Sequence, residues 1–137
     1  MAFGSFDVLH KGHEHYLKEA KSYGSYLIVV VARDDNILKF KGSKPMHDEN
    51  YRLKQIKNLK FVDKAILGNK KDILGVIEDH KPDIICLGYD QKTIDKNALI
   101  NELNKRNLHA KVVRTKPYKE KIYKSSMIKH HFLANLG

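Results

Sequence analysis

Two histidines close to the amino end are the residues of this chain best suited to chemistry. His10 and His13 are three residues apart, with Gly12 between them, at the start of a stretch with helical periodicity. On a helix this spacing puts both rings on one face. They would project from the end that carries free N–H groups and a positive dipole. The pattern predicts a site that holds a phosphate and stabilises the extra charge of a transition state.

A metal site is the alternative reading of these histidines, because His15 lies close to them. On a helix, however, His15 turns away from His13. No cysteine or carboxylate lies at a usual zinc-ligand spacing from them either. We therefore favour phosphate binding over zinc and expect no metal ligands from the protein.

The residues around the histidines carry a family resemblance. The run from Gly4 to His13, Gly-Ser-Phe-Asp-Val-Leu-His-Lys-Gly-His, resembles the signature of the nucleotidylyltransferase superfamily, a Gly-(Ser/Thr)-Phe-Asp element followed by His-x-Gly-His. Members transfer a nucleotidyl group from ATP or CTP to a phosphate and release pyrophosphate. The resemblance implies a catalytic role for two residues and nucleotide binding by six: His10 and His13 are catalytic, and Ser5, Phe6, His10, Lys11, Gly12 and His13 bind the nucleotide. Asp7 either arranges metal-bound phosphates or holds the turn.

Apolar runs alternate with helical periodicity along the chain, which is typical of an α/β fold. We expect strands at 1–6, 26–32, 62–67, 83–88 and 110–114, and helices at 12–23, 48–60, 71–80, 93–106 and after Ser125 or Ser126. The polar, basic segment 33–50 reads as a long connection, and such connections are usually functional or mobile. The first strand is short, which suggests that the natural chain begins a few residues upstream.

These elements predict a single domain over residues 1–137, built on a Rossmann-like, doubly wound parallel sheet of five strands. The resemblance implies the strand order 3-2-1-4-5, which reverses between the first and fourth strands. Ligands bind at the carboxyl ends of the strands where the order reverses. We therefore expect Ser5-Phe6-Asp7 and Gly88-Tyr89-Asp90 to meet in space.

Composition limits the setting and the partners. No apolar run is long enough to span a membrane, and no signal peptide is visible. The single cysteine, Cys86, lies in an apolar run, which fits a core residue in a reducing cytoplasm. The net charge of +10 favours anionic partners such as nucleotides. Because the lysines are scattered and no nucleic-acid-binding motif is present, we expect no dedicated nucleic-acid partner.

Further phosphate contacts are expected from two basic segments. By resemblance, at least one lysine between 33 and 45 reaches the phosphates, with Lys41 and Lys44 as candidates. Family members also carry Arg-Thr-x-Gly-Ile-Ser-(Ser/Thr)-Thr near the C-terminus. Here Arg114-Thr115 matches its start, the Gly-Ile is absent, and the chain resumes at Ser125-Ser126 after residues 116–124. Arg114, Ser125 and Ser126 are therefore candidates too, and the departure argues against the usual cytidylyltransferase substrate.

Four segments carry a narrower resemblance. Residues 31–34, 41–45, 62–68 and 81–91 are similar to those of archaeal FAD synthases. The implied reaction joins ATP and FMN into FAD and pyrophosphate, with a divalent cation such as Mg²⁺ held through the phosphates. Asp90 and Tyr118 become nucleotide contacts by the same resemblance. Asp90 accepts from a ribose hydroxyl or is simply a turn residue.

Two other functions stay open. Glycerol-3-phosphate cytidylyltransferases share the fold and the first motif, so CTP is the rival nucleotide. The non-enzyme alternative is a regulatory protein that binds nucleotides without turnover. The intact pair His10 and His13 argues against lost turnover. The resemblance further implies no tightly bound organic cofactor, and relatives are commonly homodimers.

Overall fold

Helices and short strands alternate along the chain in the computed structural model, which describes residues 1–70, 72, 74–91 and 94–117. In chain order they are β1 (Ala2–Gly4), α1 (Lys11–Ser22), β2 (Ile28–Val31), α2 (Asp34–Lys41), α3 (Glu49–Lys57), β3 (Lys64–Leu67), α4 (Gly75–His80), β4 (Ile84–Leu87), α5 (Lys96–Lys105) and β5 (Lys111–Arg114). All five expected strands are confirmed, each one to three residues shorter than predicted. The helix expected after Ser125 or Ser126 lies outside the described residues.

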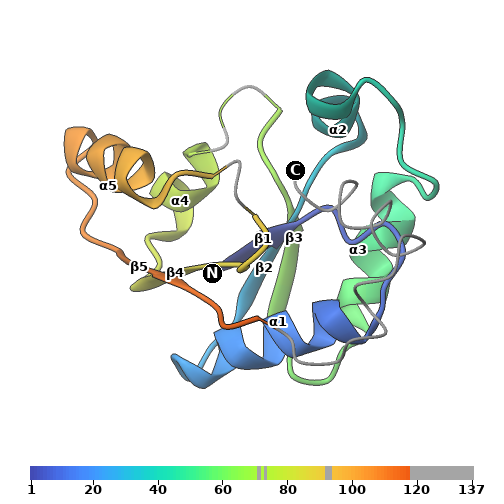
Figure 1. The fold of residues 1–137 in the computed structure, drawn as a ribbon, viewed down its shortest axis with the longest axis horizontal. Helices are drawn as coiled ribbons and strands as arrows, with labels where there is room; N and C mark the ends of the chain where they lie inside the picture. The colour runs from blue at the N-terminus through green and yellow to red at the C-terminus, as the bar shows by residue number, and fades with distance from the viewer. Residues whose placement is uncertain (71, 73, 92–93, 118–137) are drawn as a thin grey trace.

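The five strands form one parallel sheet in the order β3-β2-β1-β4-β5. This confirms the predicted α/β, Rossmann-like architecture and its reversal between β1 and β4. Figure 1 shows α4 and α5 together on one side of the sheet and α1 and α3 on the other. Because β1 and β4 are parallel neighbours, their carboxyl ends lie next to each other at the same end of the sheet.

Both faces of the sheet are buried, as the valine-rich run predicted. Val29 and Val31 of β2 face the core built with α1 and α3, while Val30 faces the core built with α4 and α5. This alternation is the period of a strand covered on both sides. Cys86 of β4 is buried in the first core, and that burial raises the pKa of its thiol to about 12.

The segment 33–50 corrects the sequence reading, because it is not one long connection. It contains the helix α2, which ends at Gly42 in the left-handed conformation (Figure 1). Only Ile37 of this helix is buried, so no apolar periodicity marks it. Its charges do, since Asp34 and Asp35 lie in the first turn and lysines lie in the last, which matches the helix dipole. Among the described residues, no helix is long and apolar enough to cross a membrane.

Candidate active site

The turn after β1 and the start of α1 are built around the two histidines. His10 is the N-cap of α1, and its Nδ1 accepts a hydrogen bond from the backbone N–H of Gly12 (3.0 Å). The backbone N–H of His10 in turn donates to Nδ1 of His13 (3.2 Å). The two side chains thus satisfy N–H groups that a helix start otherwise leaves unpaired.

This reciprocal capping fixes what the rings can do. An Nδ1 that accepts a hydrogen bond carries no proton, so each ring carries its proton on Nε2. The rings stack with centroids 3.8 Å apart, and Phe6 meets the His13 ring edge-on at 5.4 Å. The arrangement therefore offers two parallel imidazoles whose Nε2–H groups are donors suited to phosphate oxygens.

Two glycines make room for this geometry. A Cβ on Gly12 would lie 2.8 Å from the His10 ring, so the missing side chain lets that ring fold back over the helix start. A Cβ on Gly4 would lie 2.6 Å from the Phe6 ring. Phe6 itself has a φ of 53°, a strained conformation for a bulky residue that is typical of functional turns.

Ser5 brings a polar atom to the same turn. It is fully buried, and its hydroxyl has no hydrogen-bond partner among the residues that the structure describes. A buried hydroxyl without a partner costs about 1–3 kcal/mol. A phosphate oxygen accepting from Ser5 Oγ would remove that cost, which makes this hydroxyl a donor suited to an anionic ligand. Lys11, at the first position of α1, is exposed at this helix end.

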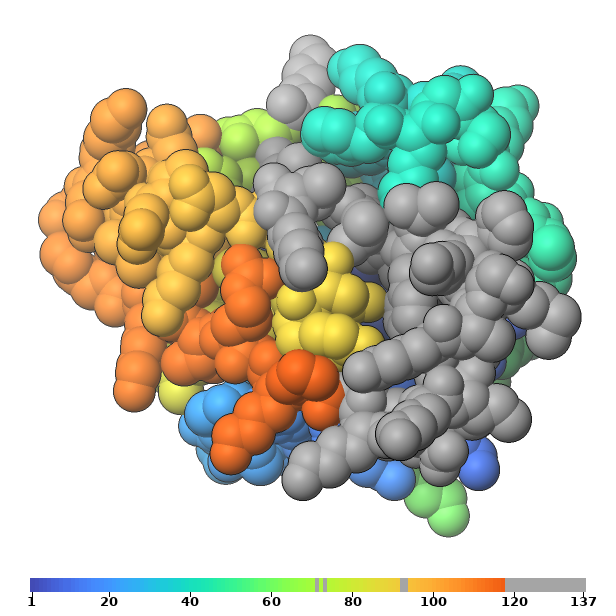
Figure 2. Space-filling view, viewed as in Figure 1, coloured from blue at the N-terminus to red at the C-terminus, as the bar shows by residue number. Residues whose placement is uncertain are grey.

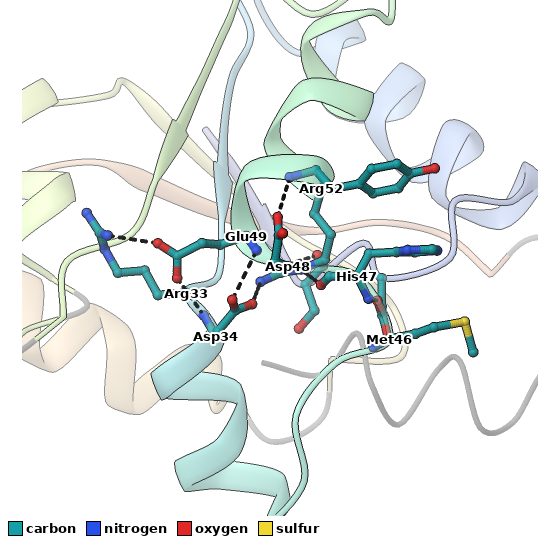
Figure 3. Close-up of polar contacts among 10 residues, drawn as sticks. Arg33, Asp34, Met46, His47, Asp48, Glu49 and Arg52 are labelled. Carbon is teal, nitrogen blue, oxygen red and sulfur yellow. Dashed lines mark hydrogen bonds and ion pairs between the residues drawn. The ribbon is translucent and has the colours of Figure 1, made fainter.

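Asp7 holds the neighbouring loop, and its role toward metal-bound phosphates stays a prediction. Its two carboxylate oxygens accept from the backbone N–H groups of Met46 (2.7 Å) and His47 (2.8 Å). The loop between α2 and α3 is thereby tied to the turn after β1 (Figure 3). Asp7 is a structural residue of the site in this conformation.

Arg52 is the buried centre of this arrangement and was not singled out from the sequence. Its guanidinium group is fully buried and donates to the carbonyls of Ser5 (2.7 Å) and His47 (2.9 Å) and to the carboxylate of Asp34 (2.7 Å). Asp34 and Glu49 also cap each other's helices reciprocally, through the N–H of Asp34 (3.0 Å) and the N–H of Glu49 (3.2 Å) (Figure 3). The turn after β1 therefore rests on α3 and the start of α2.

The loop lysines lie at the end of α2 and just beyond it. Lys41 is the last residue of α2 and is half-buried, and burial lowers the pKa of its ammonium group. Lys44 is exposed. Because partial burial disfavours the charge of Lys41, this lysine gains more from a nearby anion than the exposed Lys44 does. Contact of either lysine with phosphate stays a prediction.

The second turn, after β4, lies beside the first. The Gln91 side chain accepts from the N–H of Gly88 (2.7 Å) and donates to the carbonyl of Phe3 in β1 (2.8 Å). The turn after β4 is thus joined to β1, next to the first turn, which supports the prediction that the two turns meet. Figure 2 shows the segment after β4, in yellow, reaching the surface in the middle of this face beside the orange-red residues that follow β5.

Arg114 and Thr115 support this second turn. The Arg114 guanidinium donates to the carbonyls of Gly88 (2.9 Å), Gln91 (3.2 Å) and Ile94 (2.8 Å), and Thr115 Oγ1 accepts from the N–H of Tyr89 (3.0 Å). In this conformation the Arg-Thr pair holds backbone; phosphate contact by Arg114 stays a prediction. Tyr118, Ser125 and Ser126 lie outside the described residues.

Asp90 is the acidic group of the second turn. It is half-buried, and burial raises the pKa of its carboxyl group, while Arg114 opposes that shift. A partly desolvated carboxylate at a strand end has a strong tendency to accept hydrogen bonds, as a ribose hydroxyl would supply.

An apolar pocket opens next to these turns, at the carboxyl ends of β1, β2 and β3. Its lining is mostly apolar, with two asparagines: Phe3, Gly4, Val30, Ala32, Asn36, Ile37, Phe40, Gly68 and Asn69. Within the described ranges, no three His, Cys, Asp or Glu side chains come together to hold a metal ion.

The profile of the family described as Cytidylyltransferase-like matches residues 1–131 of this chain. The chain belongs to the cytidylyltransferase-like family. Its histidine turn and parallel sheet are thus those of a nucleotidylyltransferase.

Several relatives within this family are named FAD synthase. The one from Thermoplasma volcanium is 45% identical over 137 residues, covering 100% of this chain and 95% of the relative. The one from Methanothermus fervidus is 49% identical over 123 residues, covering 88% of this chain and 83% of the relative. A crystal structure from Thermoplasma volcanium, titled a lipopolysaccharide core biosynthesis protein, is 50% identical, with a TM-score of 0.82 over 87% of this chain and 96% of that one.

The roles of two site residues, Arg52 and Gln91, were not predicted from the sequence. Arg52 lies on a helix whose lysines face solvent, and Gln91 follows a strand with no pattern of its own. For Arg52 the available signal was its place in α3, one position before Leu53 and four before Ile56, in the apolar stripe. Gln91 ends the segment 81–91 that carries the narrower resemblance, but nothing in that segment predicts a role for its side chain.

Proposed function

We propose that this chain is an FAD synthase, which transfers AMP from ATP to FMN and releases pyrophosphate. The observation that carries the proposal is the pair of stacked imidazoles at the start of α1, each with its proton on Nε2, beside the buried Ser5 hydroxyl. The choice of ATP and FMN is supported by the relatives named FAD synthase, which match this chain over most of its length.

The reaction requires little covalent work from the protein. A phosphate oxygen of FMN attacks the α-phosphorus of ATP, a new P–O bond forms, and the bond to the bridging α–β oxygen breaks, so that pyrophosphate leaves. FMN is already an anion, and no general base is needed. His10 and His13 donate their Nε2–H groups to oxygens on which charge builds, and Ser5 and the N-terminal end of α1 hold the α-phosphate side.

The other ligand contacts follow from the two turns and the pocket. Asp90 accepts from the ribose of the nucleotide, and Lys41 or Lys44 closes on the triphosphate. We assign the apolar pocket beside Gly4 to the dimethylbenzene edge of the FMN ring system, because its aromatic and aliphatic lining suits an apolar group. Mg²⁺, carried on the phosphate oxygens, neutralises part of their charge. A homodimer and a cytoplasmic location remain parts of this proposal.

A matrix of substrates tests the reaction. The purified protein is incubated with Mg²⁺, with either ATP or CTP, and with either FMN or glycerol 3-phosphate, and released pyrophosphate is measured. We expect turnover with ATP and FMN, and FAD as the second product. Turnover with CTP alone would replace this reading by a cytidylyltransferase, and nucleotide binding without turnover would favour a regulatory protein.

A further inference from the structure

The pairing between β1 and β4 begins as a regular parallel ladder. The nitrogen of Met1 donates to the carbonyl of Ile84 (2.8 Å), and the N–H of Cys86 donates to the carbonyl of Met1 (2.9 Å). In a parallel ladder the next β1 residue to bond is Phe3, which would donate to Cys86 and accept from Gly88. Of these two, the bond between the N–H of Gly88 and the carbonyl of Phe3 is not made directly.

A tyrosine hydroxyl bonds to both partners of the first of them. The N–H of Phe3 donates to Oη of Tyr16 (3.1 Å), and the same hydroxyl donates to the carbonyl of Cys86 (2.6 Å). Tyr16 is buried, and burial raises the pKa of its hydroxyl, so it stays protonated and able to donate. One oxygen atom of α1 thus links to both strands at this point.

A glutamine amide replaces the second bond. Gln91 Oε1 accepts from the N–H of Gly88 (2.7 Å), and Gln91 Nε2 donates to the carbonyl of Phe3 (2.8 Å). Gln91 is only 4% exposed. The amide supplies one donor and one acceptor, which is what the two separated backbone groups require.

The opposite edge of β1 shows no such interruption. Three residues of β1 pair with β2, and the N–H of Ala32 continues the ladder to the carbonyl of Gly4 (2.9 Å). With β4, only Ala2 and Cys86 are paired in register. The sheet therefore separates on one side of β1 only, which is the side where the strand order reverses.

We propose that Tyr16 and Gln91 are positioning residues that hold β1 and β4 apart at the width the nucleoside triphosphate requires. Tyr16 acts from α1, one turn after His13, so the same hydroxyl also fixes the histidine helix over the gap. Gln91 acts from the turn that carries Asp90. The two inserted side chains therefore set the spacing between the group that binds phosphate and the group assigned to ribose. This inference rests on the proposed ATP site.

The test removes each inserted polar group without changing the size of the side chain much. Tyr16→Phe removes the hydroxyl that bonds to the N–H of Phe3 and the carbonyl of Cys86, and Gln91→Met removes both amide hydrogen bonds. The controls are Tyr23→Phe, on the exposed end of α1, and Gln55→Met, on α3. The affinity for ATP with Mg²⁺ is measured by calorimetry, and KM for FMN is measured by pyrophosphate release.

We expect Tyr16→Phe and Gln91→Met to weaken ATP binding about tenfold or more, with KM for FMN changed less than about threefold, and both controls to bind as the parent chain does. A merely structural role would lower the unfolding temperature and leave ATP affinity unchanged in the folded variants, and that result would overturn the inference. If the parent chain binds ATP but does not adenylylate FMN, the proposed function fails while this comparison still stands.

A measurement on the parent chain covers the case in which a variant does not fold. During titration with ATP, the backbone amides of Phe3 and Gly88 and the side-chain amide of Gln91 are followed by NMR. We expect these signals to shift, while the amide of Ile66 in β3 does not. Unchanged signals at Phe3, Gly88 and Gln91 with saturating ATP would overturn the inference.

Discussion

The turns after β1 and β4 are each held by an arginine side chain, but the two arginines differ in burial and in their partners. In each, an arginine from another element donates to backbone carbonyls. Arg52 bonds to Ser5 in the first turn and to His47 in the neighbouring loop, and Arg114 bonds to Gly88, Gln91 and Ile94. Arg52 is fully buried and paired with a carboxylate, whereas Arg114 is half-buried and bonded to backbone carbonyls. The first turn is therefore held by a fully buried, ion-paired arginine, and the second turn is held by a partly exposed arginine.

The difference between the two arginines matches the hydrogen-bonding groups that each turn offers to a ligand. The first turn offers donors on a strained backbone, with Phe6 in the left-handed region, and donors to a developing charge work only if they do not move. The second turn offers an acceptor, Asp90, whose partner is an uncharged hydroxyl. We infer that rigidity is concentrated where charge changes during the reaction.

Removing the buried arginine should have the largest effect. Arg52→Met leaves two carbonyls and Asp34 without their donor, so we expect the free energy of unfolding to fall by about 3–4 kcal/mol in urea titrations. The control is Arg33→Met, a more exposed arginine paired with Glu49, for which we expect about 1 kcal/mol or less. Equal losses in the two variants would contradict the special place of Arg52.

The catalytic and capping roles of the first turn can be separated at His10. Asparagine is a good N-cap, so His10→Asn keeps an acceptor for the N–H of Gly12 but loses the Nε2–H donor. We expect turnover to fall at least about 10²-fold, or about 2.7 kcal/mol, with the unfolding midpoint nearly unchanged. His13→Ala should lose turnover to the same degree. A near-parent rate in either variant would remove that residue from the catalytic pair.

Arg114→Met tests the looser support of the second turn. Water can reach part of this site and replace some of the lost donors, so we expect a stability loss of about 1–2 kcal/mol, smaller than at Arg52. Arg114 also keeps the pKa of Asp90 from rising further. ATP binding of the variant should therefore weaken most at acidic pH, which a calorimetric pH series would reveal.

Asp90→Asn should separate function from stability. Because burial raises the pKa of Asp90, the native state binds its proton more tightly than the unfolded chain, and ionised Asp90 lowers stability as pH rises above the ordinary value of 3.8. The variant should therefore be at least as stable as the parent at neutral pH, with the difference vanishing at low pH. ATP affinity should fall about tenfold. An unchanged affinity would leave Asp90 as a turn residue.

The sheet and the histidine turn were within reach of the sequence because their signals are local. Buried parallel strands such as Ile28–Val31 appear in the sequence as continuous apolar runs, and the spacing of His10 and His13 indicates a helix start. The helix α2 was missed because its only buried residue, Ile37, leaves no period to detect. Arg52 and Gln91 were missed because their partners, Ser5 and Phe3, are 47 and 88 residues away. Such partners are fixed by the topology and leave no pattern along the chain.

The lone thiol of Cys86 gives this chain a practical property. Lying in the core with a pKa near 12, it contributes almost no thiolate at neutral pH and should not react with maleimides in the native state. A cysteine introduced at Phe40, which is 67% exposed beside the apolar pocket, would then be the sole position to accept a dye. The natural sequence is thus ready for single-site fluorescence without a cysteine-free background.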